Sequence, residues 1–239
     1  MFWKTTTTAR HHVTDTTYAV MADRRLEPAD LDAEELTRAH GALAYLKARI
    51  GNDKMRELLA DDLAETMKRT EAWAADSTGW KNASFTLVLP GPDAVTFHQF
   101  FLSLMQQDRE LEMRAGHPDH FLNHPVEGGA GGAQVIENLG EDDLPWYIDL
   151  TFSTDQDKYP VSWDDAYPER VGAIIFNSNG TQIGSAMHEM RDTSDGMEIK
   201  FTVILPNAAP DALLDGHLRH FAVEWRNWAR LAREETAGE

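Results

Sequence analysis

The C-terminal part of the chain constrains the fold most, because its apolar residues follow the period of a long helix. They recur at alternating spacings of four and three: Leu214, Leu218, Phe221, Trp225, Trp228 and Ala232. This spacing predicts an amphipathic helix over about residues 210–235, with the apolar seam as its buried face. A helix of this kind needs a second layer of structure to cover the seam.

Short strand patterns precede this helix from Gly79-Trp80 onward. Alternating, β-branched and aromatic residues gather in six runs: 84–89, 134–139, 146–152, 171–176, 182–191 and 197–205. The last two runs flank a turn in which Asp195-Gly196 supplies the positive φ of a hairpin connection. Residues 93–107 form a helix or loop. We therefore predict an α+β fold in which an antiparallel sheet wraps the C-terminal helix and leaves a cavity between them.

The N-terminal region has a different character. Residues 31–76 carry apolar residues at helical spacings, and Gly51-Asn52 breaks the stretch into two pieces. We predict a helical hairpin here that covers the main domain or forms a dimer contact. The chain then divides into an N-terminal segment, 1–79, and a main domain, 80–239.

Composition excludes several classes of function. The chain of 239 residues has no cysteine, so any metal must be held by His and carboxylate side chains. Its formal charge of −18 repels nucleic-acid backbones and anionic lipid surfaces. No apolar run reaches about 18 residues, and residues 1–12 lack the apolar core of a secretory signal. We expect a cytoplasmic protein with neither nucleic acid nor membrane as a partner.

Two groups of side chains are candidates for chemistry. On the predicted C-terminal helix, His220 and Glu224 lie one turn apart at the border of the apolar seam, about 5 to 6 Å from each other and close enough to share a metal. A His–Glu ion pair is the alternative. The segment 116–125 contains His117, His120 and His124 in a loop in which two prolines exclude a regular helix. This density of histidines indicates either a metal or acid–base site or a surface cluster without function.

Two of the predicted strands carry a polar residue on an apolar face. Glu137 alternates onto the same side as Val135 and Leu139, where an unpaired charge is costly if that side is interior. A metal or an interior salt bridge would neutralise it. His188 shares its face with Ala186 and Met190, either as a core histidine or as a site residue.

Four short segments lie in sequence order between about residues 85 and 231: His117-Pro118-Asp119-His120-Phe121, Val135-Ile136-Glu137-Asn138-Leu139-Gly140, His188-Glu189-Met190-Arg191-Asp192-Thr193-Ser194-Asp195-Gly196, and His220-Phe221-Ala222-Val223-Glu224-Trp225. In this order they resemble the 2,4-diacetylphloroglucinol hydrolase and phloretin hydrolase family.

This resemblance implies a helix-grip fold of the Bet v 1 type, preceded by a helical region that often supports a homodimer. It also implies a zinc ion held by two histidines and two glutamates, which here are His120, Glu137, His220 and Glu224. Asn123 matches a family residue that hydrogen-bonds the substrate. His188 falls in the family's hairpin motif and is a candidate acid–base or orienting group.

The family hydrolyses a carbon–carbon bond between an acyl group and a phenolic ring, so the resemblance implies a metal-dependent hydrolase of small aromatic ketones. Residues 108–114 depart from the family, because they lack the tyrosines that usually precede the first His motif. A helix-grip protein that binds an apolar small molecule without catalysis is the main alternative. A protein whose N-terminal helices are its functional surface is another. His and carboxylate ligands also suit Mn, Fe or Co.

Overall fold

The computed structural model describes residues 18–21, 24–126, 131–140 and 144–237, and the chain falls into two compact units, 1–48 and 49–239. The first unit contains a hairpin of β1 (Ala19–Met21) and β2 (Arg24–Leu26) and most of α1 (Pro28–Ile50). Residues 1–12, on which the predicted location partly rests, lie outside the described part. Within that part, no helix has the length and apolar character needed to cross a membrane.

The N-terminal helices break where the sequence predicted. Helix α1 ends at Ile50, Gly51 has a φ of 72°, and α2 (Asn52–Leu58) and α3 (Ala60–Asp76) follow. That α1 and α3 form a hairpin stays a prediction. Helix α3 belongs to the unit that holds the main sheet, because Trp73 stacks on Trp146 of that sheet at a centroid distance of 5.4 Å. The contacts therefore divide the chain after residue 48, rather than after residue 79 as the sequence suggested.

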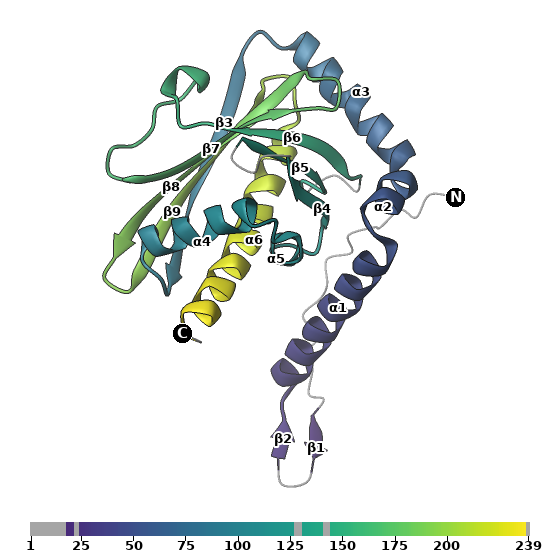
Figure 1. Cartoon of the computed structure of the whole chain (residues 1–239), viewed down its shortest axis with the longest axis vertical. Helices are drawn as coiled ribbons and strands as arrows, with labels where there is room; N and C mark the ends of the chain where they lie inside the picture. The colour runs from purple at the N-terminus through teal and green to yellow at the C-terminus, as the bar shows by residue number, and fades with distance from the viewer. Residues whose placement is uncertain (1–17, 22–23, 127–130, 141–143, 238–239) are drawn as a thin grey trace. The chain divides into compact units, whose positions relative to one another are not determined.

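A seven-stranded antiparallel sheet forms the centre of the second unit, in the order β3-β9-β8-β7-β6-β5-β4 (Figure 1). Its strands are β3 (Trp80–Pro90), β4 (His120–Pro125), β5 (Gly132–Glu137), β6 (Trp146–Phe152), β7 (Glu169–Phe176), β8 (Gln182–Thr193) and β9 (Gly196–Pro206). All six predicted strands are present. The β8–β9 hairpin closes at Gly196, whose φ is 148° and whose Cα faces the carbonyl oxygen of Leu89 so closely that a Cβ would clash.

The strand β4 corrects the prediction of a loop over residues 116–125 for its second part, 120–125, whereas residues 116–119 do form a turn before the strand. The prolines do exclude a helix, but Pro125 is the last residue of a strand at the edge of the sheet, where a missing backbone N–H is tolerated. Strand β4 pairs with β5 along its length, with one irregularity between His120 and Leu122. The His-rich segment is therefore held in the sheet.

Three α-helices, which begin at Ala94, Glu110 and Asp211, cover the inner side of the sheet. Helix α4 (Ala94–Gln106) begins at Asp93, whose carboxylate accepts a hydrogen bond from the N–H of Thr96 at 2.8 Å. Helix α5 (Glu110–Ala115) follows, and η1 (Gln156–Lys158) is a single 3₁₀ turn between β6 and β7. Helix α6 (Asp211–Ala237) packs against β3, β9, α4 and α5, and lies across one face of the sheet in Figure 1.

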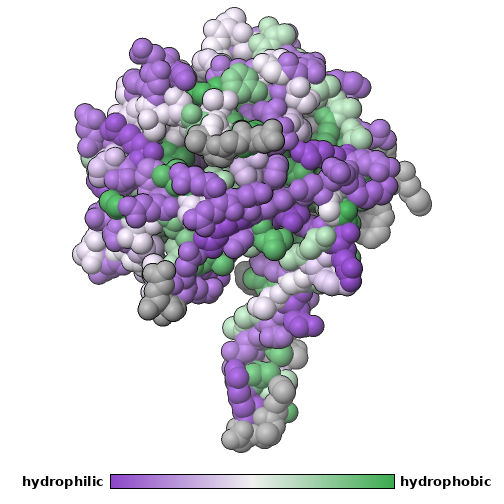
Figure 2. Space-filling view, in the orientation of Figure 1, coloured by the Kyte–Doolittle hydropathy of each residue, from purple (hydrophilic) through white to green (hydrophobic). Residues whose placement is uncertain are grey.

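The core forms between α6 and the sheet. Phe201 of β9 contacts Trp225 of α6 with a centroid distance of 5.1 Å, and both rings are buried. Hydrophilic side chains cover much of the face shown in Figure 2, as the high acidic content requires. An antiparallel sheet that wraps a long C-terminal helix is the helix-grip fold, so the predicted fold class is confirmed.

Candidate metal centre

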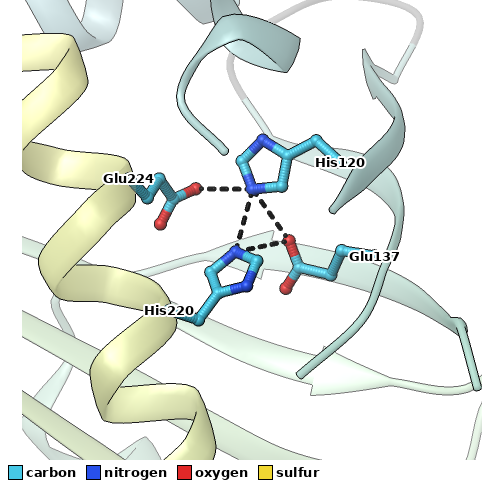
Figure 3. Close-up of side chains that lie close together, drawn as sticks. All are labelled: His120, Glu137, His220 and Glu224. Carbon is cyan, nitrogen blue, oxygen red and sulfur yellow. Dashed lines mark hydrogen bonds and ion pairs between the residues drawn. The ribbon is translucent and has the colours of Figure 1, made fainter. Parts of the chain in front are cut away.

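Four side chains from three elements point toward one another between the sheet and α6 (Figure 3). His120 begins β4 and Glu137 ends β5, and the antiparallel register makes these two residues direct cross-strand partners. His220 and Glu224 come from successive turns of α6. None of the four is more than 6% exposed. The structure thus brings together all four residues that the sequence and the resemblance selected.

The four ligand atoms have the spacing of a metal site. His120 Nε2 lies 3.0 Å from His220 Nε2 and 3.2 Å from one carboxylate oxygen of each of Glu137 and Glu224. His220 Nε2 lies 3.5 Å from Glu137 Oε2. Neighbouring ligands at about 2.0–2.1 Å from one zinc ion lie roughly 3 to 4 Å apart. The four contacts lie in that range, so the residues fit a single ion.

The orientation of His120 also fits a ligand. Its Nδ1 donates a hydrogen bond to the backbone carbonyl of Met113 in α5 at 3.1 Å, which directs Nε2 toward the other three side chains. Metal-bound histidines are usually held by such a bond through their second nitrogen. Helix α5 therefore fixes the tautomer and the direction of this ring.

Burial and the close contacts shift the pKa values of the cluster in opposite directions. Burial lowers the pKa of His120, but its ion pairs with Glu137 and Glu224 outweigh that and raise the pKa to about 10. Burial raises the pKa of Glu224 to about 7, although His120 acts against it. Burial also acts to raise the pKa of Glu137, but His220 and His120 hold it at about 2. Burial lowers the pKa of His220.

Without a metal, ion pairs alone leave charges unbalanced and hydrogen-bonding atoms unpaired in this cluster. One imidazolium, His120, would face two carboxylates, and two imidazole Nε2 atoms would lie 3.0 Å apart. Glu224 Oε2 and His220 Nδ1 are buried and have no hydrogen-bond partner in the described part of the chain. Buried polar atoms are rarely left so. A dication balances two carboxylates and accepts all four lone pairs, so the donor set fits a divalent metal better than it fits a proton.

The rival histidines of the same segment lie differently. A second group with nearby ligand atoms consists of His117, Asp119 and His220. However, the rings of His117 and His220 are stacked, with a centroid distance of 3.8 Å and an interplanar angle of 19°. The in-plane lone pairs of stacked rings run nearly parallel and do not converge on one ion. His124 faces Asp108 and Glu110, at 3.5 and 3.9 Å. Of the three histidines, His120 is the one that points into the four-residue cluster.

An apolar cavity borders the metal centre, and Glu137 and Glu224 form part of its wall. Apolar side chains line most of the rest, and five of them are aromatic: Phe101, Phe152, Phe221, Trp225 and Trp228. Val135 lines the cavity beside Glu137, and Ala186 lines it beside His188, which confirms the predicted shared faces of those strands. A second hollow of about 350 Å³ shares Phe101, Met105, Phe152 and Val171 with this cavity.

The two further site residues of the sequence prediction also line the cavity. Asn123 of β4 is buried, and its Oδ1 has no hydrogen-bond partner among the described residues. The ring of His188 in β8 packs against the rings of Phe221 and Trp225, with centroid distances of 4.8 and 4.6 Å. Burial lowers the pKa of His188 to about 3, so its imidazole is neutral at pH 7. The ring is suited to orient a ligand by hydrogen bonding rather than to store a proton.

Sequence reasoning missed two features of the site. His217 lies on α6, buried, and lines the cavity. Its spacing of three from His220 and seven from Glu224 places all three on one stripe of the helix, a signal that the sequence did contain. The sequence also placed His220 and Glu224 at the border of the core, whereas both side chains are buried, with α5 packed on α6 and His120 of β4 in contact with both.

Comparisons with known proteins add little beyond the fold. No protein-family model matches the chain, and no curated protein matches its sequence. The crystal structure of Ara h 8.0201 is similar, with 16% identity, a TM-score of 0.44, and coverage of 64% of this chain and 98% of that one. A START superfamily protein from Mycobacterium smegmatis has 8% identity, a TM-score of 0.43, and coverage of 64% and 97%. The helix-grip assignment itself rests on the strand order and on the packing of α6.

Proposed function

We propose that this chain is a zinc-dependent hydrolase that cleaves the carbon–carbon bond between an acyl group and a phenolic ring. The observation that carries the proposal is the convergence of His120, Glu137, His220 and Glu224 on one point at the wall of an apolar cavity. A metal that serves structure alone has no need of a cavity. The class of substrate rests on the resemblance to the acylphloroglucinol hydrolases.

The four ligands would hold the ion, and zinc in such a site supplies a Lewis acid that polarises a carbonyl and lowers the pKa of a water molecule. In the overall reaction, the ring carbon gains a proton and the acyl carbon gains the oxygen of water, which yields a carboxylic acid and the deacylated ring. Two carboxylates balance one dication, so the loaded centre carries no net charge beside the apolar walls.

The other residues of the cavity have separate parts in this proposal. Asn123 and His188 lie on different strands and offer buried polar atoms without a partner, namely Asn123 Oδ1 and His188 Nδ1, to orient the phenolic ketone by hydrogen bonds. The rings of Phe221 and Trp225 flank His188 and keep bulk water from the reacting atoms. In a dry site of this kind each of these polar interactions is stronger than it is in water.

Metal analysis tests the proposal most directly. We expect about one zinc ion per chain in purified protein, a sharp loss of zinc in Glu224→Ala, and no loss in Glu234→Ala, which changes an exposed glutamate of the same helix. The zinc-loaded protein should release a carboxylic acid from an acylphenol, and Glu224→Ala should not. Metal-free protein with unchanged folding, or a zinc content indifferent to Glu224, would refute the metal site.

A second function is favoured by the lining of the cavity. In the described part of the chain, no lysine or arginine lines it, and most of its wall is aliphatic or aromatic. Such a cavity suits an apolar small molecule that is carried rather than cleaved. This alternative predicts that zinc-free protein binds an apolar aromatic ligand as tightly as zinc-loaded protein does, with no product formed.

A further inference from the structure

His217 is a polar residue of the cavity that has no part in the metal centre or in the proposed function. It lies on α6, is 2% exposed, and lines the cavity. Neither Nδ1 nor Nε2 of its ring has a hydrogen-bond partner within the described residues. Leaving a buried polar group unpaired destabilises the folded state, so an apolar residue would suit the stability of this position better.

Its surroundings offer no partner within reach. The nearest acidic atom, Glu137 Oε1, lies 3.8 Å from His217 Nε2, which is longer than a hydrogen bond. The carboxylate oxygen of Glu137 that faces the metal position is the other one, Oε2. The ring of Phe221 packs on the His217 ring at 4.3 Å and shields one side of it. The polar atoms of His217 are therefore left to a molecule that enters the cavity.

The chemistry of that molecule follows from the atoms it would meet. An imidazole offers one N–H donor and one acceptor nitrogen, and a hydroxyl group both donates and accepts, so the two are matched partners. Two further residues that line the same cavity each have a buried atom without a partner among the described residues, His188 Nδ1 and Asn123 Oδ1. The apolar walls and the absence of lysine and arginine from the described lining favour a neutral ring over an anion.

We propose that His217 is a positioning residue that hydrogen-bonds a ring hydroxyl of the ligand and thereby makes the cavity prefer hydroxylated aromatic ketones over those without hydroxyls. The proposal deepens the proposed function, since it concerns the same cavity, but it does not require zinc. It assigns to His217 a contact with the ligand rather than a place among the metal ligands.

A matched pair of ketones tests this assignment in the zinc-treated full-length chain. The probes are 2,4-dihydroxyacetophenone and acetophenone, which differ in the hydroxyl groups alone, and their binding is measured by calorimetry or by quenching of Trp225 and Trp228. His217→Phe keeps the ring and removes its hydrogen bonds, and His217→Gln restores a donor and an acceptor. His40→Phe makes the same change at an exposed position of α1.

We expect His217→Phe to weaken binding of the hydroxylated probe about tenfold, as the loss of one hydrogen bond predicts, and to change binding of acetophenone less than about twofold. His217→Gln should recover part of the loss, and His40→Phe should match the unchanged protein. Zinc content should stay the same in all four proteins.

The proposal is overturned if His217→Phe weakens both probes equally, if it removes zinc, or if the unchanged protein binds neither probe or shows no preference between them. The test also separates the two proposals. Protein that holds no zinc, yet prefers the hydroxylated probe through His217, refutes the hydrolase and leaves this role of His217 standing.

Discussion

Replacing Glu224 with glutamine changes one ligand and one charge with little change in shape. In the zinc-loaded centre, two carboxylates balance the dication, and the glutamine variant would leave one uncompensated positive charge in a buried place. Loss of a supporting group around zinc costs about 10- to 100-fold in affinity, and a direct ligand should cost at least the upper value. With zinc in excess over both dissociation constants, a 100-fold loss lowers the free energy of unfolding by about 2.7 kcal/mol.

The same substitution should have a small effect when zinc is removed. His120 is then the one imidazolium shared by two carboxylates, at 3.2 Å from each. Glutamine at position 224 leaves one cation facing one anion, Glu137, and removes a carboxylate that is costly to bury. The lost ion pair and the relieved burial oppose each other, so the variant should unfold at nearly the temperature of the unchanged protein in a chelator.

Thermal unfolding in excess zinc and in a chelator measures the effect of Glu224→Gln with and without the metal. For a chain of this size, about 2.7 kcal/mol corresponds to a melting temperature lower by about 5–11 °C in zinc. Glu234→Gln, on the exposed side of the same helix, serves as the control and should show no difference in either condition. A melting temperature that Glu224→Gln lowers equally with and without zinc would show that Glu224 serves packing alone.

Three further outcomes follow from the structure. Asn123→Leu, which removes a buried amide facing the cavity, should slow cleavage of an acylphenol by at least about tenfold through a lost hydrogen bond, with zinc content unchanged; a loss of zinc would instead place Asn123 in the metal centre. Phe201→Ala deletes a fully buried ring between α6 and the sheet, and urea unfolding should show a loss of about 3–5 kcal/mol; a loss below about 1 kcal/mol would contradict the described core. The resemblance implies a homodimer, and Leu36 and Leu46 of α1 are each 56% exposed. If α1 forms the dimer contact, light scattering should show a dimer that changing both residues to glutamate converts into a monomer; a dimer that persists would exclude these two positions from the contact.

Local sequence patterns were sufficient to predict features that depend on a single helix or strand. The helical period of α6 follows from its apolar seam, and the one-turn spacing of His220 and Glu224 follows from the geometry of any helix. Glu137 was selected because strand alternation places it beside Val135, and both residues do line the cavity. These predictions depend on neighbours within about ten residues along the chain, and distant contacts do not alter them.

Tertiary structure decided the rest, because pairing between distant segments has no local signature. The prolines of the His-rich segment exclude a helix but do not reveal an edge strand, and the register of β4 on β5 is what sets His120 opposite Glu137. His120 of that strand, together with α5, also lies against the flank of α6 that the helical pattern alone placed at the border of the core. The sequence by itself determined which side chains could serve a metal, whereas the fold determined that they meet, and that His217 stands unpaired in the cavity beside them.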